Sequence, residues 1–278
     1  MSKRPPYPFV KWAGGKSRLV KHITSRLPDH MDCYYEPMVG GGAVLIHLAK
    51  YGRFNKAVIA DTNYDLITTW NVIKREPEEL IKELKKKKYR YDKAAYLRIR
   101  AYDSTKLTLV ARAARLIYLN KTCFNGLWRV NQKGEFNVPF GKYTDPIILD
   151  KANIRAVSEL LKNITIYHAD FEESVDSIDP REIDGIYIDP PYLPISNTAK
   201  FSQYTEGGFT LKDHERLAKF FKKIAKKTRV VLTNSASDKT AELYEGFDVD
   251  YFDGRRNIGG PAKYRFEARE AIIFAGKR

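Results

Sequence analysis

The strongest constraint on the fold is a repeated pattern in which a short apolar segment ends at an acidic residue. Residues 57–60 run into Asp61, residues 164–167 are followed by Asp170, and residues 185–188 run into Asp189. Apolar runs of this length predict strands that are buried on both faces. Helical patterns at residues 43–51 and 211–225 separate such strands. This alternation predicts an α/β fold with a doubly wound, mostly parallel sheet.

A glycine turn lies between the first two predicted strands. Tyr34-Tyr35 leads into Glu36-Pro37-Met38-Val39-Gly40-Gly41-Gly42, which opens the helix at 43–51. Glycines let the backbone approach a ligand closely, although any tight turn would also use them. Asp61 follows about twenty residues later, where an acid commonly holds ribose hydroxyls. Such an acid could equally be a helix cap.

The segment from 63 to 149 follows a different pattern. Helices are predicted at 64–74, 78–86, 93–103 and 108–119, and then Trp128-Arg129-Val130-Asn131, a turn at 132–134 and Glu135-Phe136-Asn137-Val138 predict a β-hairpin. We therefore expect a sheet domain made of residues 1–62 and 150–278, with residues 63–149 inserted as a helical plus β-hairpin domain. The sheet domain adds a helix at 18–27 and strands at 229–233 and 270–274.

The tetrapeptide Asp189-Pro190-Pro191-Tyr192 follows the predicted strand at 185–188. Two prolines fix φ and carry no N–H, so carbonyl groups beside them lack local donors. The Asp189 carboxylate and the Pro190 carbonyl could accept hydrogen bonds from an exocyclic amine, and Tyr192 could stack on its ring. A rigid turn explains two prolines alone, but it explains all four residues at this place poorly.

Composition points to the partner and to the compartment. Lys and Arg total 49 against 34 Asp and Glu, a net charge of +15. This surplus indicates a polyanion such as nucleic acid, although a basic surface also keeps a protein soluble. The two cysteines form no Cys/His cluster, so we expect no metal. No apolar run reaches membrane-spanning length, and the polar N-terminus resembles no signal peptide, so we expect a cytoplasmic protein.

A basic and aromatic stretch supplies candidate contacts to that partner. Phe124-Asn125-Gly126-Leu127-Trp128-Arg129 precedes the predicted hairpin turn, and Phe140-Gly141-Lys142-Tyr143 follows it. An arginine on a two-stranded ribbon can bind guanine in the major groove, and an aromatic side chain can enter a base stack. Alternatively, these aromatic residues are core and Arg129 is solvated.

Taken together, these motifs resemble the Dam-type DNA adenine methyltransferases over most of the chain. Lys11-Trp12-Ala13-Gly14-Gly15-Lys16 resembles the family's first motif, and the glycine turn, an insertion and Asp-Pro-Pro-Tyr follow in the family's order. Asn120 and the hairpin segment resemble its recognition hairpin, and Phe201, Tyr204 and Phe209-Thr210 its loop after the catalytic motif. Met38 departs from the family, which usually has Phe there.

The resemblance implies a Rossmann-like methyltransferase sheet with a target-recognition insertion, and it implies a role for each matching residue. The catalytic residues would be Asp189, Pro190, Pro191 and Tyr192. The S-adenosylmethionine pocket would contain Trp12, Ala13, Gly14, Lys16, Glu36, Pro37, Gly40, Asp61, Asp170 and Asp189. Bases of a GATC site would be read by Lys11, Leu127, Arg129, Pro139 and Tyr143, Arg100 would contact phosphate, and Phe124 and Asn125 would fill the gap left by a flipped adenine.

The resulting hypothesis is methyl transfer from S-adenosylmethionine to adenine N6 in double-stranded DNA. The base would be flipped, because N6 is buried in a paired duplex, and transfer would be direct and in line, without a metal. We expect a monomer that associates with the nucleoid; a solitary, a restriction–modification and a phage-borne enzyme are all compatible. Alternatives are a methyltransferase acting on an RNA or protein amine and a non-catalytic DNA-binding relative. A dinucleotide oxidoreductase fits less well, because the turn lacks a full GxGxxG.

Overall fold

The computed structural model describes residues 5–176, 182–193, 208–255 and 267–276. Its centre is a seven-stranded sheet with the order β3-β2-β1-β4-β5-β7-β6, in which the first five strands are parallel and β7 runs antiparallel to both of its neighbours. The predicted Rossmann-like, mostly parallel α/β fold is therefore confirmed. The strands are β1 (Met31–Glu36), β2 (Phe54–Asp61), β3 (Ile164–His168), β4 (Gly185–Ile188), β5 (Arg229–Ser235), β6 (Asp248–Arg255) and β7 (Glu267–Ala275).

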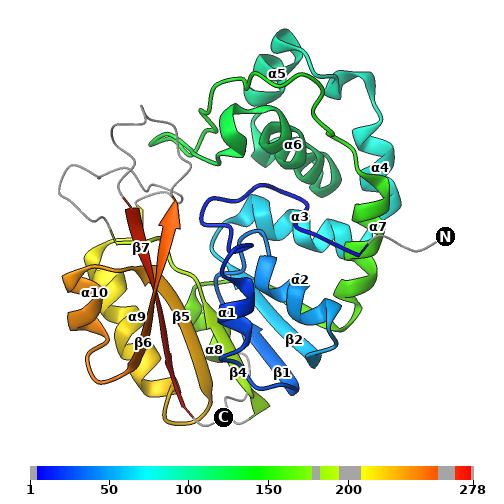
Figure 1. Cartoon of the computed structure of the whole chain (residues 1–278). Helices are drawn as coiled ribbons and strands as arrows, with labels where there is room; N and C mark the ends of the chain where they lie inside the picture. The colour runs from blue at the N-terminus through cyan, green and yellow to red at the C-terminus, as the bar shows by residue number, and fades with distance from the viewer. Residues whose placement is uncertain (1–4, 177–181, 194–207, 256–266, 277–278) are drawn as a thin grey trace.

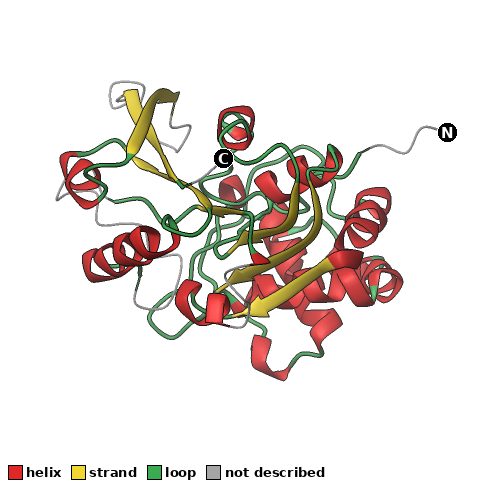
Figure 2. Ribbon diagram, turned by 90° about the horizontal axis from the view of Figure 1, so that it is seen from below, coloured by secondary structure: helices red, strands yellow, loops and turns green. Residues whose placement is uncertain are grey.

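Two apolar layers cover the sheet, because successive side chains of a strand point to opposite faces. Tyr34 of β1 belongs to one buried cluster and Tyr35 to the other. Figure 1 shows the two sets of helices on the two sides of the strands, and Figure 2 shows the same layering from below. One cluster contains residues of α1 (Val20–Thr24), α2 (Ala43–Lys50), α3 (Tyr64–Arg75) and α7 (Lys151–Leu160), and the other contains residues of α8 (Phe171–Asp176) and α9 (Leu211–Ile224), with α10 (Asp238–Leu243) beside α9.

The inserted segment is helical and continues the first of these apolar layers. Its first helix is α3, and α4 (Pro77–Leu84), α5 (Lys93–Arg100) and α6 (Leu109–Thr122) follow. The central helix, α6, packs against α3, α4 and α5, while α3 also contacts β2 and β3. The segment 63–149 therefore contacts the sheet through α3, and its later helices lie at the top of Figure 1. The division of the chain into two domains stays a prediction.

Several predicted elements are shorter in the structure than in the sequence pattern. The helix expected at 18–27 is α-helical only over Val20–Thr24, because the amides of Arg26 and Leu27 bond three residues back. The helix expected to reach Asp103 ends at Arg100, since Asp103 caps a separate turn. The hairpin is shorter than expected: Val130 and Phe136 form a single antiparallel bridge. Backbone bonds from the Asn131 amide to Glu135 and from the Asn137 amide to Arg129 flank it.

The glycine turn packs closely against α3 at Gly42. Gly42 has φ +69°, and a Cβ added there would lie 2.7 Å from two ring atoms of Trp70. Gly42→Ala should therefore cost about 1–2 kcal/mol for the left-handed backbone and a further ~1–3 kcal/mol for the steric overlap. The free energy of unfolding in urea measures both costs together.

Gly52→Ala is the matched control for this substitution. Gly52 has φ +61°, but an added Cβ there meets nothing within 4 Å, so only the backbone cost applies. Equal destabilisation by the two substitutions would show that contact with Trp70 does not constrain the turn.

Candidate active site

The acidic residues singled out in the sequence gather at one edge of the sheet. β1 and β4 are adjacent and parallel, with Tyr34 in register with Gly185, and the strand order reverses between them. Ligands of such sheets bind beyond the carboxyl ends of the strands at this point. Glu36 ends β1, Asp61 ends β2, and Asp189 directly follows β4. The fold therefore brings three carboxylates to the edge where a ligand is expected.

A buried ion pair joins the N-terminal motif to this edge. The Lys16 ammonium lies 2.8 Å from Asp189 Oδ2, and the Lys16 side chain is only 5% exposed. The same ammonium donates to the Gly14 carbonyl and lies 4.8 Å from the centre of the Tyr192 ring. Asp189, Tyr192 and a backbone carbonyl therefore surround one nitrogen atom.

Burial dominates the electrostatics of the site. Loss of solvent raises the pKa of Glu36 to about 8, with Asp189 raising it further, although the Tyr34 hydroxyl donates to Glu36 Oε2 at 2.7 Å. Burial also raises the pKa of Asp189, and Lys16 and Thr233 oppose that shift. Low solvent access makes each carboxylate costly to ionise without a nearby cation.

Side chains from neighbouring elements hold the Asp-Pro-Pro-Tyr segment. Thr233 of β5 donates to Asp189 Oδ1 at 2.8 Å. His214 of α9 hydrogen-bonds to the backbone of Pro191, and burial lowers the pKa of that imidazole to about 4. The Tyr192 hydroxyl donates to Glu270 Oε2 at 2.6 Å. The segment is thus fixed along its length.

The glycine turn is closed by two tryptophans and an acid. Asp61 Oδ2 accepts from the Gly40 amide at 3.0 Å, and the Trp70 indole donates to the Gly40 carbonyl at 3.1 Å. A Cβ on Gly40 would lie 2.8 Å from Trp12 Cδ1, so the turn lies directly against that indole. Burial raises the pKa of Asp61. Gly40 is therefore held between the Trp12 ring and the Asp61 carboxylate.

Asp170 lies further along the same edge, after β3. Its Oδ2 atom accepts from Arg216 at 2.7 Å, and its Oδ1 atom accepts from the Glu172 amide at 3.0 Å. In the sheet order, β2 and β1 separate β3 from β4. Asp170 thus belongs to the carboxyl edge, but two strands separate its own strand from that of Asp189.

Asn120 connects the first motif to the inserted segment. Its buried carboxamide accepts from the Lys11 amide at 2.8 Å and donates to the carbonyls of Lys11 and Gly126 at 2.7 and 2.9 Å. The Lys11 ammonium lies 4.8 Å from the centre of the Tyr143 ring. Two of the predicted base-reading residues, Lys11 and Tyr143, are thereby brought together.

The other residues predicted to meet DNA surround this junction. Phe124 is 46% exposed, and Asn125 beside it has a left-handed φ of +54°. Pro139 accepts from the Phe124 amide at 2.9 Å, and Leu127 packs at the edge of the core. Arg129 Nε donates to Asn137 Oδ1 at 2.7 Å and stays exposed, whereas Arg100 reaches the Val138 carbonyl at 3.3 Å.

Comparison with known proteins identifies the family. The model of the D12 class N6 adenine-specific DNA methyltransferases matches residues 12–258. The chain belongs to this family. A Type II methyltransferase, M1.LlaDCHI, from Lactococcus lactis subsp. cremoris is 40% identical over 273 residues, covering 96% of this chain and 94% of the relative. The DNA adenine methylase of Escherichia coli K12 is 32% identical over 267 residues, covering 95% and 93%.

This D12-class protein is an adenine-specific DNA methyltransferase, and its family and fold imply S-adenosylmethionine as methyl donor. The residues present fit that donor. Glu36, Asp61 and Asp189 place three carboxylates at one edge, and Lys16 is the ammonium paired with one of them. A cationic sulfonium suits this excess of buried acid, and the glycine turn lets the backbone approach a ligand.

Three side chains that contact the Asp-Pro-Pro-Tyr segment were not predicted from the sequence: Thr233, Glu270 and His214. Thr233 and Asn234 lie at the carboxyl end of β5, so the rule that identified Asp189 could have identified them. Glu270 lies at the same edge only because β7 is antiparallel to β5. The sequence pattern of β7 carried no signal of its direction.

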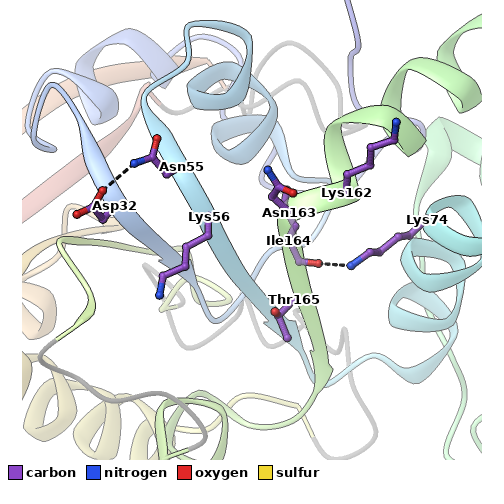
Figure 3. A pocket seen from close by; sticks show the side chains of 8 residues that line it. All are labelled: Asp32, Asn55, Lys56, Lys74, Lys162, Asn163, Ile164 and Thr165. Atoms are coloured by element: carbon purple, nitrogen blue, oxygen red, sulfur yellow. Dashed lines mark hydrogen bonds between the residues drawn. The ribbon is translucent and has the colours of Figure 1, made fainter.

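A cavity lies away from this edge. It has a volume of about 640 Å³ and is lined by residues near the starts of β1, β2 and β3, together with Lys74 and Lys162. Figure 3 shows these residues, including Lys74, whose ammonium donates to the Ile164 carbonyl. Lys56 pairs with Glu182, and Lys162 with Glu159. Strand starts form the opposite edge from the ligand side of a parallel sheet, so we assign no catalysis here.

Two features are absent from the described residues. Within the described ranges, no helix has the length and apolarity that crossing a bilayer requires. The same residues contain no group of three or more His, Cys, Asp or Glu that could hold a metal ion.

The raised pKa of Glu36 makes stability depend on pH. Its ordinary value is 4.5 and its value in the folded enzyme is about 8, so the folded state binds the proton more tightly. The contribution of Glu36 is fully present below pH 4.5 and is lost as pH rises toward 8, at up to about 1.4 kcal/mol per pH unit. Glu36→Gln should remove this loss.

The measurement is the free energy of unfolding of both proteins without donor, between pH 5 and pH 8. Wild type should lose stability relative to Glu36→Gln as pH rises. A constant difference across this range would contradict a raised pKa.

Proposed function

We propose that this enzyme methylates adenine N6 within GATC in duplex DNA, by flipping the base and transferring the methyl group directly and in line. The arrangement of Asp189 and Tyr192 supports this proposal most strongly. The Lys16 ammonium lies 2.8 Å from Asp189 Oδ2 and 4.8 Å from the centre of the Tyr192 ring, so a carboxylate and an aromatic ring converge on one small region. An exocyclic amine attached to a planar ring would use both, the amine on a carboxylate oxygen and the ring on the face of Tyr192.

The Asp-Pro-Pro-Tyr segment is proposed to bind the flipped adenine. Asp189 and the Pro190 carbonyl accept the two hydrogen bonds of the N6 amine, Tyr192 stacks on the ring, and Pro191 stiffens the segment between them. The nitrogen lone pair of an aromatic amine is delocalised, and two acceptors favour a more tetrahedral nitrogen whose lone pair can react. Thr233 fixes the Asp189 carboxylate at 2.8 Å, so part of the catalysis is positioning.

S-Adenosylmethionine would be held by Trp12, Ala13, Gly14, Lys16, Glu36, Pro37, Gly40, Asp61, Asp170 and Asp189. When bound, the donor supplies an electrophilic methyl group on a sulfonium. Asp61 and the Gly40 turn bind hydroxyl and backbone groups of the donor. Asp189 supplies negative charge, and a bound sulfonium would favour the ionised form of Glu36, whose pKa is about 8 without it. Lys16 keeps Asp189 ionised by pairing with it. No metal takes part in this proposal.

The inserted segment is proposed to read the sequence. Lys11, Leu127, Arg129, Pro139 and Tyr143 face bases of GATC. Arg100 contacts a phosphate, and Phe124 with Asn125 fills the space that the flipped adenine leaves. The exposure of Phe124 and Arg129 supports these roles, since both side chains are accessible to a duplex. In this proposal, residues 1–62 and 150–278 form the catalytic domain and residues 63–149 form the recognition domain. The enzyme acts as a monomer in the cytoplasm, where it associates with the nucleoid.

Asp189→Ala tests the proposed acceptor site. The variant should retain the fold at reduced stability, because the buried Lys16 ammonium loses its carboxylate partner. Transfer to adenine should fall by at least about 1000-fold as both orientation and electrostatic stabilisation are lost. The measurement is single-turnover transfer of a labelled methyl group to duplex DNA, with circular dichroism as the check on folding.

Glu215→Ala is the matched control, since Glu215 is an exposed acid on α9. It should transfer the methyl group at the wild-type rate. Native-rate transfer by Asp189→Ala would exclude Asp189 from the acceptor site.

A further inference from the structure

The hydroxyl of Tyr192 is bound by a carboxylate from a distant part of the chain. It donates to Glu270 Oε2 at 2.6 Å, across 78 residues of sequence. Hydrogen bonds to a carboxylate are shorter and stronger than those between neutral groups. A strong bond at the tip of the ring limits how far that ring can move.

Glu270 is itself held in place from both sides. In register, it pairs with Ser235 of β5 and with Phe252 of β6, so β7 is flanked by two strands at this residue. Side chains on such a strand are positioned more precisely than side chains on a loop. The backbone of the residue that accepts from Tyr192 is therefore held by strand pairing on both sides.

The backbone beyond Tyr192 is tied to the end of β5. The Leu193 amide donates to Asn234 Oδ1 at 3.2 Å, and the Ser235 hydroxyl donates to the Leu193 carbonyl at 2.9 Å. These bonds fix the chain but not the ring, which still rotates about its own side-chain bonds. The contact with Glu270 restrains this remaining freedom.

We propose that Glu270 is a positioning residue of the methyl-transfer reaction, which holds the Tyr192 ring as a preformed stacking surface for the flipped adenine. The inference rests on the proposed function, because it presumes that Tyr192 stacks on the base. Glu270 touches neither base nor donor in this account. It acts by reducing the number of ring orientations that an entering adenine must select.

The test uses Glu270→Ala, Glu270→Gln, Tyr192→Phe and the double variant Glu270→Ala/Tyr192→Phe. Loss of a hydrogen bond to a charged group should slow single-turnover transfer about tenfold in Glu270→Ala. Glu270→Gln keeps an acceptor for the hydroxyl and should recover most of the rate. Tyr192→Phe should be slowed similarly, and the double variant no more than either single change, because all three lose the same bond.

A second readout reports stacking directly. A duplex with 2-aminopurine at the target position gains fluorescence when the base leaves the stack, and stacking on Tyr192 quenches part of that gain; Glu270→Ala should weaken this quenching and so give a larger gain than wild type. DNA affinity should change less than twofold. Glu245→Ala, which removes an exposed glutamate just beyond α10, is the control and should match wild type in rate and quenching. Thermal unfolding of each variant checks its folding.

Tyr192→Ala separates this inference from the function on which it rests. If Tyr192→Ala loses transfer and quenching while Glu270→Ala retains both at wild-type levels, Glu270 is not a positioning residue and the stacking role of Tyr192 stands. If Tyr192→Ala itself retains both, the proposed stacking is wrong. Additive losses in the double variant would also overturn the inference.

Discussion

β1 and β4 are parallel neighbours at the centre of the sheet. From this pair the sheet continues through β2 and β3 on one side and through β5, β7 and β6 on the other. This parallel pairing sets Glu36 and Asp189 at one edge, although 153 positions separate them, since 189 − 36 = 153. Burial raises the pKa of both carboxyl groups, and Asp189 raises that of Glu36 further, so a nearby cation favours their ionised forms. Lys16 supplies one, and a sulfonium donor would supply another. The strand order thereby sets the electrostatic character of the site.

The same short segment that carries Lys16 also carries Lys11. Lys16 reaches Asp189, whereas Lys11 is bound through its backbone by Asn120 and lies against the Tyr143 ring. The insertion and the sheet are therefore joined by one stretch of chain that contacts both sites. In the proposed function, this stretch links the reading of bases to the placement of the reacting amine.

The sequence was most informative where strands are buried on both faces. β4 was predicted with its observed bounds, and Asp189 was placed at its end, because parallel strands appear as continuous apolar runs. β6 was missed, since Asp248, Asp250 and Asp253 interrupt its apolar pattern. The hairpin at 128–138 was predicted as two strands, and the structure has a short antiparallel bridge there, with the Asn131 carboxamide accepting from amides in its turn. Glu270 was missed because its place in the site depends on the direction of its own strand, β7, which runs antiparallel to β5.

The claim that this edge serves sequence-specific adenine methylation is tested most directly by offering labelled S-adenosylmethionine with two duplexes. One contains GATC, and the other has the same base composition with the site scrambled. The account predicts label on adenine N6 in the GATC duplex and at most a few per cent of that rate in the other. Equal labelling of both duplexes would contradict the proposed GATC specificity, and no labelling of adenine in either would contradict the account of the site itself.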